Sequence, residues 1–307
     1  EKKEFKKSIK CFEQTIEANP DNFFAYNNIG FSYKHLGDFN KAEFFFKKSI
    51  EKNTDFIEGH INYSTTLLSQ KKFDEGFEEY EFRKQSKIFP DYIRYRELKI
   101  KTTIWNGQDI YGKTILIFTE QGIGDLFQFS RYIYELHDRF KAKVILRLKH
   151  NLFHFFNSKK IQTITEQDKI PFHDFHQHLM SLPGIFYKKN KSFLPNNNFI
   201  NYDNEKLKKW EIFFKSFSGL KVGINSDTTL REGATGSLER LIPIEQFSVL
   251  TNIKNINFFV LQRDFDENKL KIINKKSNVN YFKKLDKSVK PFEDTVGIIK
   301  NLDLVIT

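Results

Sequence analysis

A glycine-containing block at residues 120–125, with the sequence Glu-Gln-Gly-Ile-Gly-Asp, is the part of the chain best suited to chemistry. It follows an apolar run at 114–118 whose β-branched residues predict a buried parallel strand. Glycines after such a strand let the backbone bend sharply. They also let a ligand approach the next helix, where free N–H groups favour anions. An Asp at this turn, here Asp125, can serve as a helix cap.

The block differs from two better-known phosphate-binding loops. The third glycine of the dinucleotide fingerprint is missing, because Phe127 or Gln128 stands at that position. It is not a Walker loop either, since no Gly-Lys-Ser/Thr follows. The glycines alone therefore do not identify the ligand.

Three histidines, His173, His176 and His178, raise the question of a metal site. Their spacing is irregular and no cysteine is near, since Cys11 is the single cysteine of the chain. Structural metal sites need closed sets of four ligands, so we expect no metal and no cofactor. One cysteine also allows no intrachain disulfide, which suits a reducing compartment and predicts a cytoplasmic protein.

The overall charge of the 307-residue chain is basic, with a formal net charge of +11. Its lysines are scattered in ones and twos and form no long run, which favours a solvated basic surface. No nucleic-acid-binding motif is present, so a nucleic-acid partner, suggested by charge alone, is not expected. No stretch of 18 apolar residues occurs, which predicts no membrane span.

The first 85 residues repeat with a period of 34, which is the period of tetratricopeptide repeats. The repeat shows as aromatic residues at Phe5, Phe39 and Phe73 and as small residues at Ser8, Ala42 and Gly76. We expect one second helix near 3–17, a full repeat at 22–52 and a further helix pair at 56–86. So short a stack implies further repeats before Glu1, or capping by the next domain. The repeats could bind a partner peptide or acceptor protein, or could simply support the neighbouring domain.

Further strands are predicted at 144–148, 220–225, 257–262 and 302–307. Strand, glycine turn, helix and strand in succession predict a doubly wound α/β domain. A helix around Trp210 and Phe214 links two such halves. Because the sequence stops on a strand, we expect the second half to be incomplete.

Several segments in order resemble bacterial tetratricopeptide-containing glycosyltransferases of the heptosyltransferase-like family nine. More distantly, they are similar to O-linked N-acetylglucosamine transferases. The segments are 105–117, the 120–125 block, 128–132, 174–183, 240–243, 261–263 and 302–307. The resemblance covers nearly the whole chain, and the 120–125 block is its most specific part. The segment after 224 departs from it, because Asn225-Ser226-Asp227 stands where the family carries an aromatic residue and a small-residue turn.

The resemblance implies a GT-B fold, in which two α/β halves hold acceptor and nucleotide-sugar donor. It implies that Asp125 is the general base, since an acceptor hydroxyl must lose a proton as it attacks the anomeric carbon. Gln121, Gly122 and Gly124 would form the acceptor or turn loop. Arg240 and Arg263 are candidates for the donor phosphates, with surface ion pairs as the alternative. No metal is implied.

The predicted organisation is multidomain, α followed by α/β. Tetratricopeptide-type repeats occupy 1–86 and a connector 87–112. The acceptor-side half of a GT-B-like domain covers 113–205, and an incomplete donor-side half covers 206–307. The predicted function is transfer of a sugar from a nucleotide-sugar to a hydroxyl of a protein, glycan or lipid-linked glycan. The alternative is a non-catalytic interaction protein whose transferase-like domain has degenerated.

Overall fold

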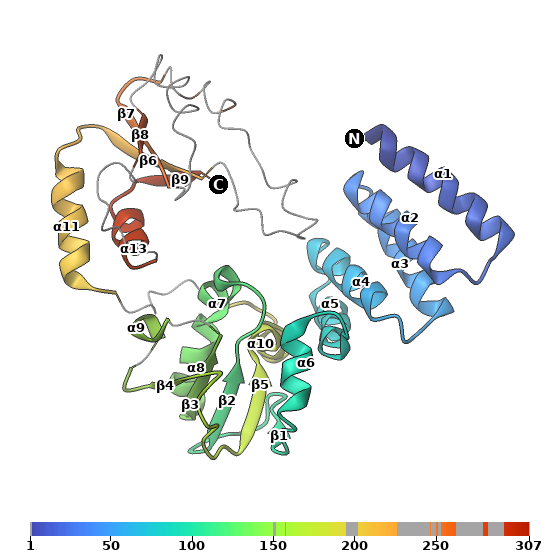
Figure 1. Ribbon diagram of the computed structural model, residues 1–307, viewed down its shortest axis with the longest axis horizontal. Helices are drawn as coiled ribbons and strands as arrows, with labels where there is room; N and C mark the ends of the chain where they lie inside the picture. Colours follow the sequence, from blue (N-terminus) through green and yellow to red (C-terminus); the bar gives the residue numbers. More distant parts are fainter. Residues whose placement is uncertain are drawn as a thin grey trace. The chain divides into compact units, whose positions relative to one another are not determined.

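The computed structural model describes residues 2–149, 152–156, 158–194, 202–225, 246, 250, 253–261, 279–281 and 292–306. The chain divides into two compact units, Glu1–Ile200 and Asn201–Thr307. Each unit is described by itself, and Figure 1 gives the element labels.

The first unit begins with five helices, α1 (Lys2–Ala18), α2 (Phe23–His35), α3 (Phe39–Lys52), α4 (Ile57–Ser69) and α5 (Phe73–Tyr80). Two of them start on a capping side chain: Asn22 accepts the Ala25 N–H at 3.1 Å, and Asp38 accepts the Lys41 N–H at 3.1 Å. Gly30 allows α2 to approach α3, because a Cβ there would lie 2.8 Å from the Phe46 ring. The predicted helical repeats are confirmed.

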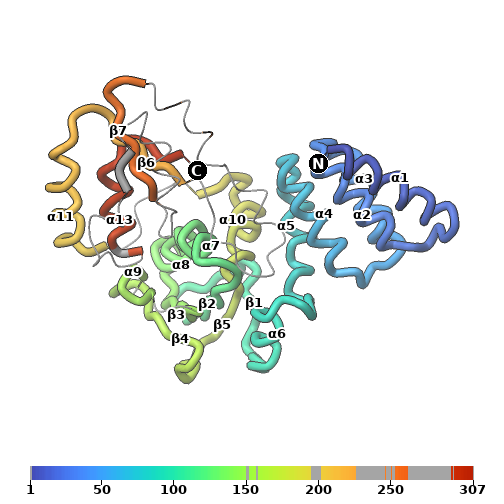
Figure 2. Tube along the Cα trace, turned by 45° about the horizontal axis from the view of Figure 1, so that its top comes forward, coloured from blue at the N-terminus to red at the C-terminus, as the bar shows by residue number. Residues whose placement is uncertain are grey.

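A short 3₁₀ helix, η1 (Glu81–Gln85), and helix α6 (Pro90–Glu97) carry the chain from the repeats to the first sheet. Figure 2 shows this path from α5 through α6 to the strand β1. The stretch 87–112, expected as a connector, thus contains α6 and the two-residue strand β1 (Thr103–Ile104).

The first sheet is parallel, with strand order β1-β5-β2-β3-β4. Its other strands are β2 (Thr114–Phe118), β3 (Lys143–Leu148), β4 (Ile161–Thr165) and β5 (Phe175–His178). The helices of this region are α7 (Ile123–Phe129), α8 (Arg131–Phe140), α9 (Phe153–Phe156), η2 (Leu179–Ser181) and α10 (Leu182–Asn190). The β2 residues 115–118 are all buried, as expected of a parallel strand covered on both faces.

Two apolar clusters hold this sheet. In one, Leu116, Phe118 and Ile145 pack with Tyr95 of α6 and with Leu98, which follows it. In the other, fully buried Trp105 meets Phe140 of α8 and Phe186 of α10 edge-on, with ring centroids 5.6 and 6.1 Å away. Neighbouring strand residues face opposite sides of a sheet, so β2 can contribute to both.

The second unit contains α11 (Asn204–Lys215), β6 (Leu220–Ile224), β7 (Ile256–Val260), β8 (Val279–Tyr281), α13 (Glu293–Lys300) and β9 (Leu304–Ile306). Its sheet is also parallel, in the order β8-β7-β6-β9. Helices α11 and α13 meet through Trp210, Phe214 and Ile298, which pack against Phe259 of β7. The indole of Trp210 donates to the buried carboxylate of Asp294 at 2.8 Å.

Apart from the edge strand β1 of the first sheet, the two sheets share one topology. In each set of four strands, the first strand (β2 or β6) is central, the next two add outward on one side, and the fourth (β5 or β9) lies on the other side. The orders are β4-β3-β2-β5 and β8-β7-β6-β9. Such a reversal makes a topological switch point, where open α/β sheets bind ligands outside the carboxyl ends of their strands. A parallel-sheet α/β region follows the repeats, as predicted.

Candidate functional site

The 120–125 block lies at the switch point of the first sheet. It begins two residues after β2, which pairs with β3 on one side and with β5 on the other. The segment that leaves β5 returns to the block, since the Met180 N–H donates to Glu120 Oε1 at 2.9 Å. The loops that follow β2 and β5 therefore meet here, where a ligand of the sheet is expected.

Asp125 occupies the first turn of α7 and is half-buried. Its Oδ2 accepts the backbone N–H of Gly122 at 3.0 Å, in the manner of a capping box. The helix cap considered from the sequence is thus present in a modified form, with Gly122 at the cap position and Asp125 three residues later. This hydrogen bond fixes the carboxylate at the sheet edge, and a fixed carboxylate is also what a general base requires.

The sharp turn depends on Gln121, not on the glycines. Gln121 has φ +62°, whereas Gly122 has φ −90° and ψ 167°, which any residue adopts. Gly124 lies within α7, and a Cβ placed on it would meet nothing within 4 Å. The prediction that the glycines make the sharp bend possible is therefore wrong. The open space beside Gly124 nevertheless leaves room for a ligand.

A small recess of about 20 Å³ lies beside the block, between the carboxyl ends of the strands and α6. Glu120 and His178 both line it, and Glu120 Oε2 lies 3.5 Å from His178 Nδ1. Burial lowers the pKa of His178 to about 4, although the Glu120 carboxylate opposes this shift, so the imidazole is neutral. A volume of this size holds about one water molecule, which can satisfy donors and acceptors together.

The rings of His173 and His176, two of the three histidines considered as metal ligands, make different polar contacts. The His173 ring contacts the Pro171 carbonyl at 2.9 Å. The His176 ring lies between the Tyr95 and Thr102 hydroxyls, at 2.7 and 2.8 Å. Within the described parts of the chain, no group of three His, Cys, Asp or Glu side chains is arranged to hold a metal ion.

The donor-phosphate candidates Arg240 and Arg263 both lie outside the described residues. Their proposed role is therefore untested by the structure. In the second unit, the carboxyl end of β6 is described, and there the Asn225 N–H donates to the Ile306 carbonyl at 2.9 Å.

Three residues that touch the 120–125 block were not anticipated: Arg83, Asp91 and Lys149. Arg83 Nη2 donates to Glu120 Oε1 at 2.8 Å, Asp91 Oδ2 accepts the Gln121 N–H at 2.9 Å, and Lys149 Nζ donates to the Gln121 carbonyl at 3.0 Å. The sequence carries no sign of these contacts, because the partners are 28 to 37 residues apart along the chain.

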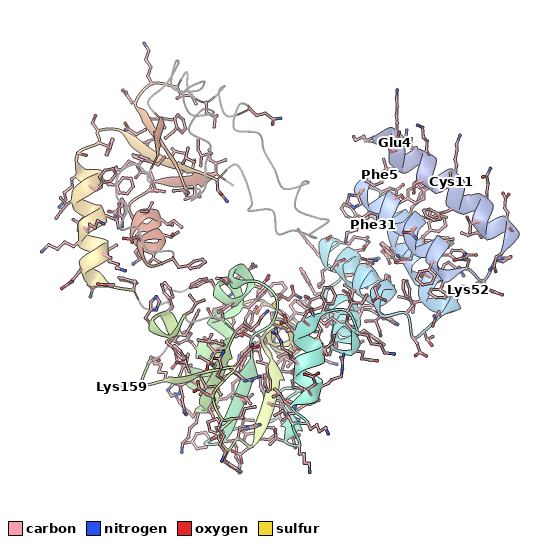
Figure 3. All side chains as sticks on the ribbon, in the orientation of Figure 1. Glu4, Phe5, Cys11, Phe31, Lys52 and Lys159 are labelled. Carbon is pink, nitrogen blue, oxygen red and sulfur yellow. The ribbon has the colours of Figure 1, made fainter. Side chains whose placement is uncertain are left out.

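The repeats present an aromatic row on α1 and α2. The His35 ring stacks on Phe5 with a centroid distance of 4.8 Å and lies 4.3 Å from the ring of Phe31, which is 43% exposed. Figure 3 labels Phe5 and Phe31 at one edge of the repeat stack and Lys52 at the other.

Polar contacts join α2 to α4, since Asn62 Nδ2 donates to Asn27 Oδ1 at 3.0 Å.

Known proteins match this chain over part of its length. Residues 11–44 match the family model described as tetratricopeptide repeat. The chain is 30% identical over 129 residues to protein FlbA of Caulobacter vibrioides, which is 41% of this chain and 21% of FlbA. It is 33% identical over 74 residues to the STIP1 homolog of Dictyostelium discoideum, which is 24% of this chain and 13% of that protein. The chain thus matches only a small share of either relative.

Two solved structures are similar to part of the chain. One is the TPR2B domain of yeast Sti1 in a pHsp70 complex, with 21% identity over 27% of this chain and 67% of that chain, and a TM-score of 0.26. The other is MamA, with 20% identity over 31% of this chain and 51% of that chain, and a TM-score of 0.26. The family model and the observed helices agree that the N-terminal region consists of tetratricopeptide repeats. Among the helices in the described residues, none has the length and apolar character to cross a membrane.

Proposed function

We propose that this chain forms part of a GT-B-type glycosyltransferase that moves a sugar from a nucleotide-sugar to a hydroxyl acceptor. The observation that carries the proposal is the position of Asp125, a partly exposed carboxylate held in the first turn of α7, the helix after β2, at the switch point of a parallel sheet. The second parallel sheet, with the same strand order, supports it, because a GT-B enzyme needs two such halves.

In the proposed reaction the acceptor oxygen forms a bond to the anomeric carbon of the donor sugar. The bond from that carbon to the diphosphate oxygen breaks, and the nucleoside diphosphate leaves with the electron pair. Asp125 takes the proton of the attacking hydroxyl. The negative charge on the diphosphate needs N–H groups or cationic side chains, and Arg240 and Arg263 remain the candidates for that task.

A test must separate general-base catalysis from capping of α7, since Asp125 has both roles in this proposal. Asp125→Asn keeps an oxygen that can accept the Gly122 N–H but cannot take a proton, whereas Asp125→Ala loses both. We expect Asp125→Asn to fold normally and to lower turnover by about 10² or more, the range of general base catalysis. Turnover is measured as nucleotide release from a panel of nucleotide-sugars, using the natural full-length protein with and without acceptor.

The matched control is Asp38→Asn, which alters another helix-capping aspartate, at the start of α3. It should leave turnover at the wild-type level. Wild-type turnover in Asp125→Asn together with loss in Asp125→Ala would assign Asp125 to capping and end its role as base. No nucleotide binding by the wild type would end the transferase proposal itself.

The second candidate is a non-catalytic protein-interaction module, favoured by the exposed ring of Phe31 in the aromatic row of the repeats. Tetratricopeptide repeats suit a scaffold that holds a peptide, and a peptide or acceptor-protein partner is proposed for this surface. The two candidates differ at the sheet, because only the transferase requires nucleotide-sugar binding and turnover there. Nucleotide binding and turnover by the wild-type protein therefore decide between them.

A further inference from the structure

The last part of the repeat region reaches into the first sheet through one buried cation. Arg83 follows α5 in η1, and the residue is only 1% exposed. Its Nη2 donates to Glu120 Oε1 at 2.8 Å and to Ser181 Oγ at 2.9 Å. Its Nη1 donates to the Tyr80 carbonyl at 3.0 Å and to Glu81 Oε1 at 2.9 Å. One planar guanidinium thus joins the repeats to the segments after β2 and β5.

Glu120 depends on this cation for its charge. The residue is 1% exposed, and burial raises the pKa of its carboxyl, but the Arg83 guanidinium together with smaller contributions from His178 and Tyr92 outweighs burial, so the pKa lies below the usual range. A buried charge is tolerated where it is paired and hydrogen-bonded. The Met180 N–H supplies a further bond to the same carboxylate oxygen. The first residue of the 120–125 block is therefore ionised and fixed.

The next residue, Gln121, is also held by groups from the repeat helix α5 and from α6. Its N–H donates to Asp91 Oδ2 at 2.9 Å, and its side-chain Nε2 donates to the Tyr80 hydroxyl at 2.6 Å. Its left-handed φ of +62° is sparsely populated for a residue other than glycine, so such a conformation persists only where neighbours impose it. The segment from Tyr80 to Asp91 provides these neighbours.

We infer that Arg83 is a positioning residue for the loop 119–122 and, through that loop, for Asp125. The repeat region then contributes directly to the structure of the candidate acceptor site, in addition to any role in binding a partner. The claim about loop order stands on geometry alone, whereas its consequence for turnover rests on the proposed transferase function.

The test uses two replacements of different severity in the full chain. Arg83→Lys keeps the charge but loses the planar fork, so it cannot serve Glu120, Ser181 and the Tyr80 carbonyl together. The double change Arg83→Met with Glu120→Met removes both charges at similar volume, which avoids an uncompensated buried ion and preserves folding. Folding is checked by circular dichroism and by the fluorescence of Trp105.

The readout is amide hydrogen exchange in peptides covering 119–125. Thr119, Gln121 and Gly122 each donate an N–H to a defined partner, Arg147 O, Asp91 Oδ2 and Asp125 Oδ2 respectively, so their amides are protected while the loop is ordered. We expect exchange at least about tenfold faster in the folded double variant, with an intermediate rate in Arg83→Lys. The control is Lys52→Met with Asp21→Met, a surface pair at 2.8 Å, which should leave the loop unchanged.

The outcomes separate the inference from the proposed function. Wild-type exchange at 119–125 in a folded double variant overturns the positioning role. Faster exchange together with lower kcat for transfer and unchanged nucleotide binding supports positioning of the acceptor site. Faster exchange in a protein whose wild type neither binds nor turns over nucleotide-sugars supports the positioning role while overturning the transferase.

Discussion

At the scale of single residues, the carboxyl edge of the first sheet concentrates buried polar groups. Glu120 Oε2 and His178 Nδ1 are 3.5 Å apart, and both residues are almost wholly buried. Proteins tolerate such groups when they are paired or neutral. Here Glu120 is paired by Arg83, and His178 is neutral because burial penalises the imidazolium. The fold therefore requires Glu120 to be ionised and His178 to be neutral, so protonation of these groups in acid should destabilise this edge of the sheet.

The neutral histidines predict a pH dependence of stability. Burial lowers the pKa of His176 and of His178 to about 4 in the folded chain, against 6.5 ordinarily. As the pH falls below 6.5, the unfolded chain binds protons that the folded chain excludes, so stability falls. At pH 5 the loss is about 2 kcal/mol per histidine. The carboxylates with lowered pKa, such as Glu81 at about 2, do not contribute at that pH.

The measurement is urea unfolding at pH 7.5 and pH 5, followed by the fluorescence of Trp105 in a Trp210→Phe background. His178→Phe should remove about half of the difference, since one imidazole remains. A free energy of unfolding that is equal at the two pH values would contradict the neutral buried histidines.

At the scale of elements, the repeats and the sheet meet through close contact of α5 with α10. A Cβ added at Gly184 of α10 would lie 2.8 Å from Cβ of Phe77 on α5. Shortening Phe77 to Ala would not relieve this contact, because the Cβ remains. Gly184→Ala should therefore destabilise the first unit by about 1–3 kcal/mol, as overpacking does.

Gly124→Ala is the matched control, because the space around that position is open. In a helix, Ala is favoured over Gly by about 0.5–1 kcal/mol, so this change should stabilise or leave the unit unchanged. Both values come from urea unfolding monitored at Trp105. Equal effects of the two changes would show that α5 and α10 are not in close contact.

Element prediction from the sequence succeeded where a local pattern decides the structure. The 34-residue period locates the repeat helices, because each buries the same face, and the apolar run 114–118 gives β2 directly. Strand β5 was missed, since Phe175–His178 contains three polar residues and no β-branched one. It is a strand because distant partners satisfy its side chains, as when Lys84 donates to Gln177 at 2.9 Å. Helix α6 has the same explanation, with its apolar face covered only in the fold.

Of the candidate site, only the central 120–125 block was predictable from the sequence. The position of the glycine block follows from the strand, the turn and the helix, whereas Asp125 became a candidate base only through the family resemblance. The contacts of Arg83 and Asp91 with the block arise from chain segments that pattern and spacing do not bring together. Long-range ion pairs of this kind depend on tertiary structure, so the sequence indicates where the block lies but not what orders its loop.

At the scale of the whole molecule, the division of the chain predicts its unfolding. The repeats share a compact unit with the first sheet, tied by Arg83 and by the contact of α5 with α10, while the second sheet has its own core around Phe259. Calorimetry should therefore show two transitions. Phe46→Ala in the repeats and Ile117→Ala in β2 remove fully buried side chains, each costing about 2–5 kcal/mol.

Both changes should lower the same transition, by about 10 °C, and leave the other in place. Phe259→Ala should lower only the second. The alternative is that the repeats unfold as a separate array, since neighbour-only contacts allow a stack of repeats to lose cooperativity. Phe46→Ala would then shift a transition that Ile117→Ala leaves unchanged. That result would separate the repeats from the sheet despite the buried Arg83 pair, and it would make the order of the 119–122 loop independent of the repeats.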